Sequence, residues 1–233
     1  PKINDFIRSL SVIMNNKNVC VIEVPYLVNL IKKKQIDTIY HEHYSYFSLL
    51  SLQKIFNNYS LVMFDVKLIK THGGSLRIFI KKNENSKFKI LPSVKNLILK
   101  ERQMGLHKLN YYKKFSSQID IILKKNEKKI KLLCKKNKVL GYGAAAKATI
   151  ISNLLKIRST HINFIFDQNK FKQSRFIPGS NIKILNPNIL KKYKPSYILI
   201  FVWNIKNEVR KYVKSKLKLK CKFITLTPNI KIS

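Results

Sequence analysis

A short apolar stretch runs directly into a glycine turn and a run of small residues at Val139–Lys147. Gly141 and Gly143 allow the sharp reversal between a buried strand and the helix that packs on it, which is typical of the first strand of a doubly wound sheet. Further strand patterns lie at 162–166, 197–202 and 222–226, with helices expected near Asn153, Leu190 and Val209. The sequence therefore predicts an α/β fold with a Rossmann-like parallel sheet over residues 138–233.

The N-terminal part predicts a second, incomplete sheet. A buried-strand pattern at 19–24 ends at Pro25, and strands are expected over 61–69 and 75–80 after a helix at 48–58. This order matches the last part of a doubly wound sheet whose final strands form an antiparallel hairpin, as in a class I methyltransferase domain. The first half of such a sheet is missing, and the sequence starts inside an amphipathic helical pattern, so we expect a fragment.

A long helical pattern separates these two parts. Between Val94 and Asn137, apolar residues mark one face and lysines the other. We therefore predict three consecutive segments. These are the end of a methyltransferase-type sheet at 1–90, a helical connector at 91–137 and the Rossmann-like domain at 138–233.

The strongly basic composition raises the question of an anionic partner. The chain of 233 residues has 47 Lys and Arg against 11 Asp and Glu, a formal charge of +36. Nucleic acid would attract such a chain, but the lysines are scattered beside Asn and Ile instead of forming a stripe interleaved with aromatics. We interpret the charge as compositional drift and expect no nucleic-acid partner.

Cysteine use and hydropathy predict the compartment. Cys20, Cys134 and Cys221 are far apart and lack the spacing of a metal site or a disulfide framework. No apolar run approaches the roughly 20 residues that a bilayer span requires. We expect a cytoplasmic protein without a membrane partner.

Three kinds of proton-handling side chain lie together in the aromatic stretch after Ile39. Tyr40, His41, Glu42 and His43 bring phenol, imidazole and carboxylate groups into four consecutive positions. A histidine has a pKa near neutrality, and an adjacent carboxylate can orient its ring, so His43 with Glu42 suits general acid–base catalysis. Zinc is the alternative, but the third and fourth ligands that it needs are missing from the pattern. We predict an active site without a metal.

A second candidate site is the hairpin turn before the strand at 75–80. His72 and Arg77 flank the paired glycines Gly73 and Gly74. Glycines allow a tight turn or the close approach of a ligand, and Arg offers a planar fork of donors to an anion or a sugar. The sequence leaves a plain turn and a binding site equally open.

Polar groups at the strand ends of the Rossmann-like part are the third candidate site. The turn Gly141–Gly143, with Tyr142 between its glycines, could present amide groups to a phosphate, and Lys147 could add a charge. Asp167 lies near the position of a ribose-binding acid, but the third glycine of a dinucleotide fingerprint is absent. Further candidates after later strands are Trp203 and Asn204, and the turn Pro178–Ser180 with its basic neighbours Lys172 and Arg175.

Taken together, these blocks resemble the sugar-nucleotide C-methyltransferases. The residues that carry the resemblance are Glu23–Tyr26, Ile36–His43, His72–Arg77, Gly141–Ala144 with Lys147, Pro178–Ser180 and Trp203–Asn204. The resemblance implies methyl transfer from S-adenosylmethionine to carbon 3 of a nucleotide-linked 4-keto deoxysugar through an enolate. Such enzymes have an N-terminal zinc domain and a glycine turn for the cofactor, and this sequence contains neither.

The resemblance also implies residue roles. His43 would be the base, Glu42 would orient it, Tyr40 would donate to the oxyanion, and His41 is a reserve candidate. Contacts to the substrate would come from His72, Gly73, Gly74, Arg77, Gly141, Tyr142, Gly143, Lys147, Trp203 and Asn204. A separate chain would carry the missing N-terminal half. The alternatives are a non-catalytic sugar-nucleotide-binding protein and a basic nucleic-acid-binding protein.

Overall fold

The computed structural model describes residues 2–233, with the exception of the His72 side chain. The chain forms two compact units. The first contains the chain up to Lys32 together with His43–Ser116, and the second contains Lys33–Glu42 together with Ser117–Ser233. Each unit thus combines two separate stretches of the sequence, whereas the sequence pattern predicts consecutive segments. A ten-residue piece of the N-terminal half thus belongs to the C-terminal unit.

The first unit is built on a three-stranded antiparallel sheet. Its strands are β1 (Cys20–Pro25), β2 (Leu61–Ile69) and β3 (Ser75–Lys82), in the order β1-β3-β2. In the register of β1 and β3, Glu23 lies opposite Arg77. The helix, strand, helix and closing hairpin that the sequence predicts are all present.

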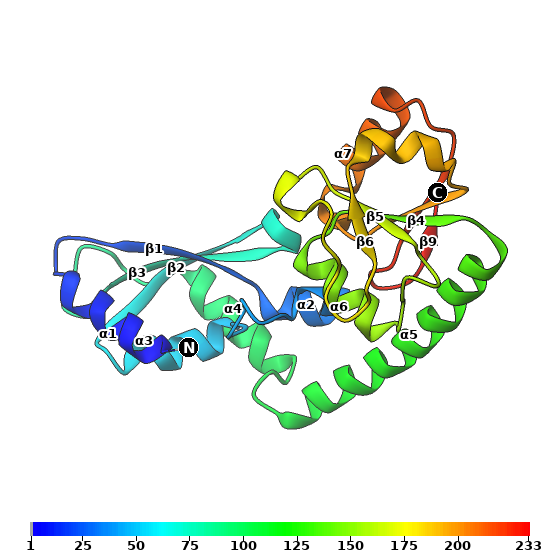
Figure 1. Ribbon diagram of the computed structural model, residues 1–233. Coiled ribbons are helices and arrows are strands. Elements are labelled where there is room, and N and C mark those ends of the chain that lie inside the picture. The colour runs from blue at the N-terminus through cyan, green and yellow to red at the C-terminus, as the bar shows by residue number, and fades with distance from the viewer. Residues whose placement is uncertain (1) are drawn as a thin grey trace. The chain divides into compact units, whose positions relative to one another are not determined.

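Helices lie along one face of this sheet (Figure 1). They are α1 (Ile3–Ile13), α3 (Leu49–Asn57) and α4 (Pro92–Gln103), while α2 (Leu27–Lys33) follows β1. The helix α3 begins with a capping box in which Ser48 and Ser51 exchange side-chain and backbone hydrogen bonds. The core between helices and sheet contains fully buried apolar side chains, among them Leu49, Phe56, Leu61, Leu76, Ile78 and Ile80.

The second unit is a doubly wound α/β domain, as predicted. The strands β4 (Val139–Tyr142), β5 (Phe164–Phe166), β6 (Lys183–Leu185), β7 (Tyr197–Ile200) and β8 (Lys222–Thr225) are parallel, and β9 (Lys231–Ile232) is antiparallel. The sheet order is β6-β5-β4-β7-β8-β9. The chain therefore winds outward on one side of β4 and then returns to the other side, which places the topological switch point between β4 and β7.

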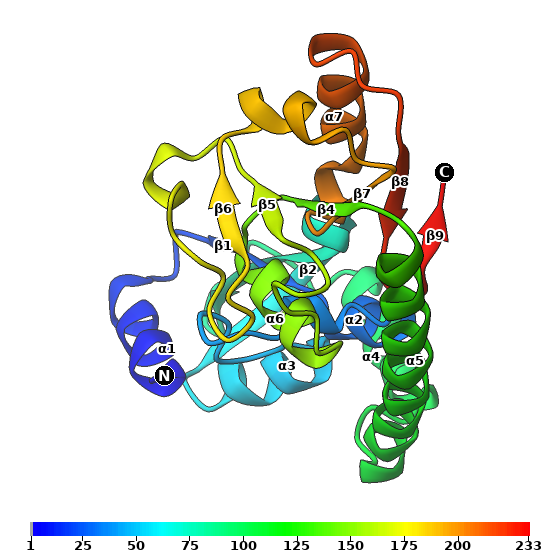
Figure 2. The same cartoon turned by 45° about the vertical axis from the view of Figure 1, so that its right-hand side comes forward.

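Helices cover both faces of this sheet (Figures 1 and 2). They are α6 (Ala146–Leu154) and the part of α5 (Leu109–Lys136) that belongs to this unit, from Ser117 on, on one face, and α7 (Lys206–Lys211), continued by a π-helical turn at Tyr212–Lys216, on the other. The helix expected near Leu190 is a 3-10 helix at Pro187–Tyr193. Asn126 of α5 donates from Nδ2 to the carbonyl oxygens of Leu226 and Pro228, at 3.3 and 2.9 Å, and so fixes the loop after β8.

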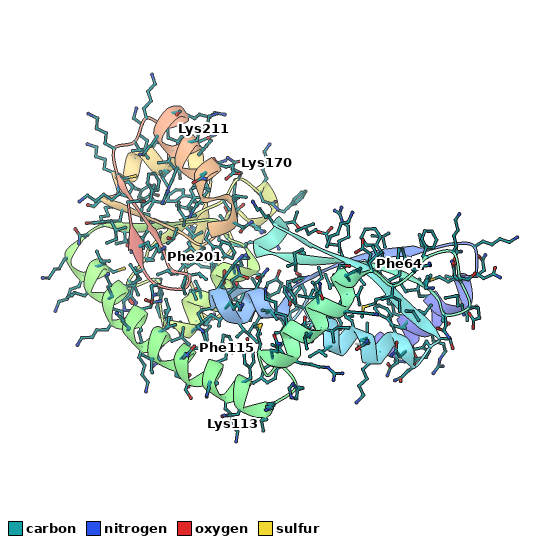
Figure 3. The ribbon with its side chains drawn as sticks, turned by 180° about the vertical axis from the view of Figure 1, so that it is seen from behind. Phe64, Lys113, Phe115, Lys170, Phe201 and Lys211 are labelled. Carbon is teal, nitrogen blue, oxygen red and sulfur yellow. The ribbon has the colours of Figure 1, made fainter. Side chains whose placement is uncertain are left out.

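Most of the basic side chains lie on the outside of the units, with Lys81 as a buried exception. Lys170 and Lys211 of the second unit are exposed, whereas Phe201 after β7 is buried (Figure 3). None of the helices in the described part of the chain combines the length and the apolar character that a bilayer span requires.

Candidate active site at the edge of the parallel sheet

The glycine turn after β4 lies at the carboxyl edge of the parallel sheet, where open α/β sheets bind ligands. Gly143 has a φ of +91°, and a Cβ atom there would lie 2.5 Å from Cγ2 of Val202. Gly141 has a different role, because a Cβ atom at this position would lie 2.5 Å from Cγ1 of Ile165 inside the sheet. Gly143 thus allows the backbone to turn close to Val202 at the sheet edge, and Gly141 allows neighbouring strands to pack.

Hydrogen bonds within the unit already occupy the amide groups of this turn. The Gly143 amide donates to the Phe166 carbonyl at 2.8 Å, and the Ala144 amide donates to Oδ2 of Asp167 at 2.7 Å. Nζ of Lys172 donates to the Ala144 carbonyl at 2.9 Å. The Asp167 carboxylate therefore takes a place at this turn that a phosphate takes in nucleotide-binding sheets.

A pocket of about 210 Å³ opens beside the turn. It is lined by Tyr142, Gly143, Asp167, Gln168, Val202, Ile205, Glu208, Val209 and Tyr212. Burial raises the pKa of Tyr142 to about 12, so its phenol is protonated at neutral pH. Two carboxylates, two phenols and apolar side chains suit an uncharged polar or aromatic group better than a phosphate.

On the same edge, Asp37 contacts two of the predicted site residues, Trp203 and Lys147. The 3-10 turn Ile36–Thr38 belongs to the second unit, and Oδ2 of its Asp37 accepts a short hydrogen bond from the indole Nε1–H of Trp203. Nζ of Lys147, in the first turn of α6, lies 4.0 Å from the same oxygen and 4.2 Å from the centroid of the Trp203 ring. A carboxylate, an ammonium and an indole thus form one cluster.

Asp37 is buried and Lys147 is partly buried, and this burial shifts the pKa of both groups. Asp37 is 1% exposed, and its Oδ1 has no hydrogen-bond partner among the described residues. Burial raises the pKa of Asp37, an effect that Lys147, Trp203 and, more weakly, the Asp37 backbone and the Thr227 side chain oppose. Burial lowers the pKa of Lys147, and the Asp37 carboxylate opposes that shift. For each of the two groups, the charge of the other is therefore the largest effect that opposes the pKa shift caused by burial.

Asp37 received no role in the sequence analysis. It lies within a block that carries the family resemblance, beside the more conspicuous histidines. A signal was present, because Asp37 is one of only 11 acidic residues in a highly basic chain and lies between Ile36 and Thr38-Ile39. An acid in such apolar surroundings is uncommon unless it is paired.

The predicted catalytic residues follow directly after this cluster. Tyr40 is half-buried, and its pKa is raised by burial and then by the charges of Glu42 and Asp37. His41 and Glu42 are exposed in a turn. His43 is half-buried and belongs to the first unit, where its ring meets Tyr46 edge-on at 6.2 Å between centroids. The chain therefore crosses from one unit to the other within the predicted active-site segment.

The described residues contain no group of three or more His, Cys, Asp or Glu side chains arranged for a metal ion. In an extended chain, His41 and His43 would lie on the same face, as two zinc ligands from this segment would have to. The structure places a turn at His41 and Glu42 instead.

The hairpin turn of the first unit is closely packed. Gly74 has a φ of +120°, and a Cβ atom there would lie 2.0 Å from Nδ2 of Asn29. Arg77 forms an ion pair with Glu23 at 3.1 Å, and the Thr71 hydroxyl donates to the same carboxylate at 2.9 Å. Gly73 also has positive φ. The side chain of His72 lies outside the described residues, so its predicted contact stays a prediction.

The remaining candidates of the second unit are separate from the Asp37 cluster. Asn204 is exposed in the 3-10 turn that starts at Trp203. The turn Pro178–Ser180 packs against α6, where Nδ2 of Asn153 donates to the Pro178 carbonyl at 2.9 Å. Arg175 is exposed on the segment before this turn.

Comparison with known proteins identifies the family. The family described as "C-methyltransferase C-terminal domain" matches residues 70–228. The chain is 30% identical to the C-methyltransferase NovU of Streptomyces niveus over 233 residues, which is 100% of this chain and 55% of that protein. The chain thus spans little more than half of this relative. The resemblance noted from the motifs is confirmed at this level, and the chain belongs to the C-methyltransferase family, of which it contains the C-terminal region.

Proposed function

We propose that this chain is the substrate-side part of an enzyme that transfers a methyl group to carbon 3 of a nucleotide-linked 4-keto deoxysugar through an enolate. The observation that carries the proposal is the placement of Tyr40–Glu42. This stretch belongs to the second unit and begins three residues after Asp37, which is hydrogen-bonded to Trp203 at the carboxyl edge of the parallel sheet. Ligands bind at this edge in doubly wound sheets, so acid–base groups there are suitably placed for chemistry on a bound sugar.

The proposed chemistry follows from carbon acidity. A proton on the carbon beside a ketone can be removed because the resulting charge delocalises onto the ketone oxygen. We assign proton removal to His43, its orientation to Glu42, and hydrogen-bond donation to the developing oxyanion to Tyr40. The raised pKa of Tyr40 keeps its phenol protonated, as a donor must be. His41 is the reserve base.

S-adenosylmethionine is the methyl donor in this proposal, because its sulfonium supplies an electrophilic methyl group. The described residues do not form the usual glycine turn for it. The first strand β1 runs into Pro25 and Tyr26, and the glycines Gly73 and Gly74 join two antiparallel strands. We therefore assign no residue of this chain to that cofactor.

A further proposal concerns the partner that carries the rest of the sheet. On the first sheet, β1 has β3 on one side and no other described strand on the other side. An open edge of this kind accepts a further strand. We propose that the N-terminal half of the enzyme, on a separate chain or on a preceding segment, pairs there.

The test is proton exchange at the sugar carbon in deuterated buffer, followed by NMR, with a nucleotide-linked 4-keto-6-deoxysugar and the complete enzyme. The enzyme with His43 intact is expected to exchange the proton, and His43→Ala to reduce the rate at least about 100-fold without weakening substrate binding. His107→Ala, an exposed histidine of the first unit, is the matched control. Exchange at an undiminished rate in His43→Ala would refute the base assignment.

A non-catalytic sugar-nucleotide-binding protein is the second candidate. It is favoured by one observation, the lack of a glycine turn for S-adenosylmethionine among the described strands of the first unit. Calorimetry with the sugar nucleotide, with and without S-adenosylmethionine, separates the two functions. Binding of the sugar nucleotide without proton exchange or methyl transfer in the complete protein would favour the binding function.

A further inference from the structure

Asp37 connects three parts of the second unit that are far apart in the sequence. Its own 3-10 turn comes from the N-terminal half, Lys147 comes from the start of α6, and Trp203 follows β7. One carboxylate oxygen meets both the indole Nε1–H and the ammonium group. The inserted segment Lys33–Glu42 is thereby bonded on both sides of the switch point between β4 and β7.

Stability alone does not explain a carboxylate at this position. Asp37 is 1% exposed, and its second oxygen has no hydrogen-bond partner among the described residues. A buried polar atom without a partner destabilises the folded state, and a buried ion pair is often no better than an apolar pair of the same volume. Groups that are retained against stability commonly serve function.

The local backbone links Asp37 to the predicted active-site segment. The Thr38 amide donates to the Gln35 carbonyl at 3.1 Å, and the Ile39 amide donates to the Ile36 carbonyl at 3.0 Å. Only two residues separate Asp37 from Tyr40, whose phenol pKa is itself raised in part by the Asp37 charge. These hydrogen bonds fix the backbone of the turn. The position of Asp37 therefore determines the position of the residues that follow it.

We propose that Asp37 is a positioning residue. It binds Trp203 and Lys147 and thereby fixes the Tyr40–Glu42 stretch at the carboxyl edge of the sheet. Lys147 and Trp203 then act on the reaction through Asp37. The catalytic meaning of this placement rests on the proposed function, but the placement itself does not.

The chain offers a direct probe, because Trp203 is its single tryptophan. Asp37→Ala removes the acceptor of the indole Nε1–H, and is expected to shift Trp203 emission to longer wavelength as water replaces the carboxylate. Amide hydrogen exchange over residues 36–42 is expected to become at least roughly tenfold faster, while the strands β4 and β7 keep their protection. Asp37→Asn retains an oxygen acceptor for the indole, so its emission is expected to stay near that of the unmodified chain.

Asp120→Asn is the matched control, since Asp120 is an exposed acid on α5 of the same unit. It is expected to change neither emission nor exchange. Unchanged emission or unchanged exchange over 36–42 in Asp37→Ala would overturn the proposal, and so would a loss of protection throughout the sheet, which indicates a general structural role. None of these readouts depends on methyl transfer, so an inactive complete enzyme would count against the proposed function alone.

Discussion

Two buried carboxylates, one in each unit, have opposite hydrogen-bonding environments. Glu101 of the first unit is fully buried, and its two oxygens accept from the amides of Leu49 and Leu50 at 2.9 and 2.8 Å. Asp37 of the second unit is buried to nearly the same extent. One of its oxygens meets Trp203 and Lys147, and the other has no hydrogen-bond partner among the described residues.

The difference separates a group that stabilises the fold from one that positions a site. Glu101 accepts from amides at the N-terminus of α3, where the helix leaves donors unpaired and favours negative charge. Its neighbour Tyr26 has a pKa raised by burial and then by the Glu101 carboxylate, so the phenol stays protonated beside it. Asp37 has fewer hydrogen-bond partners at nearly the same burial, as expected for a group whose role is to position the segment that carries it.

The largest effect is expected from Glu101→Ala. This change leaves the amides of Leu49 and Leu50 buried without their acceptor, and is expected to lower the free energy of unfolding by about 3 kcal/mol. Urea denaturation measures it, with Glu84→Ala, an exposed acid of the same unit, as the control. A loss below about 1 kcal/mol would remove the contrast with Asp37.

Ser48→Ala is expected to have a smaller effect at the same helix end. The Ser48 hydroxyl oxygen accepts from the Ser51 amide at 3.2 Å, whereas Glu101 accepts from the two preceding amides. Loss of the Ser48 cap is expected to lower the free energy of unfolding by about 1 kcal/mol, because one amide is affected instead of two. A Ser48→Ala loss as large as that of Glu101→Ala would contradict the leading role of the carboxylate.

The fold was largely predictable because hydrophobic periodicity is a local signal. The glycine turn at 141–143 predicted the parallel sheet, and the strand patterns predicted β1 and the β2–β3 hairpin. The interleaving of the two units was not predictable, because no local pattern tells that Lys33–Glu42 packs with residues more than a hundred positions later.

The candidate site could be proposed in part from residue types and from the ends of predicted strands, which are also local signals. Tyr40, Glu42 and His43 are conspicuous by residue type, and Lys147 and Trp203 follow predicted strands. The proposed role of Asp37 depends on long-range contacts with Lys147 and Trp203, which no local sequence pattern predicts. Asp167 shows the converse, because its sequence position suggested ribose binding while its carboxylate accepts from the Ala144 amide.

The smallest effect is expected from Asp37→Asn. At pH 7 its free energy of unfolding is expected to lie within about 1 kcal/mol of the unmodified chain. Burial raises the folded-state pKa of Asp37 above the unfolded value of about 3.9, so the folded chain binds this proton more tightly. The contribution of Asp37 to stability is therefore fully present below the unfolded pKa and is lost as the pH rises through the folded pKa.

Urea denaturation of both proteins between pH 7 and pH 4 measures this dependence, with Asp120→Asn as the control. The unmodified chain is expected to gain stability relative to Asp37→Asn as the pH falls. The opposite trend, a gain as the pH rises, would mean that the Lys147 ammonium outweighs burial and holds the folded pKa of Asp37 below its ordinary value. Asp37 would then stabilise the fold, as Glu101 does, and the distinction between the two buried carboxylates would fail.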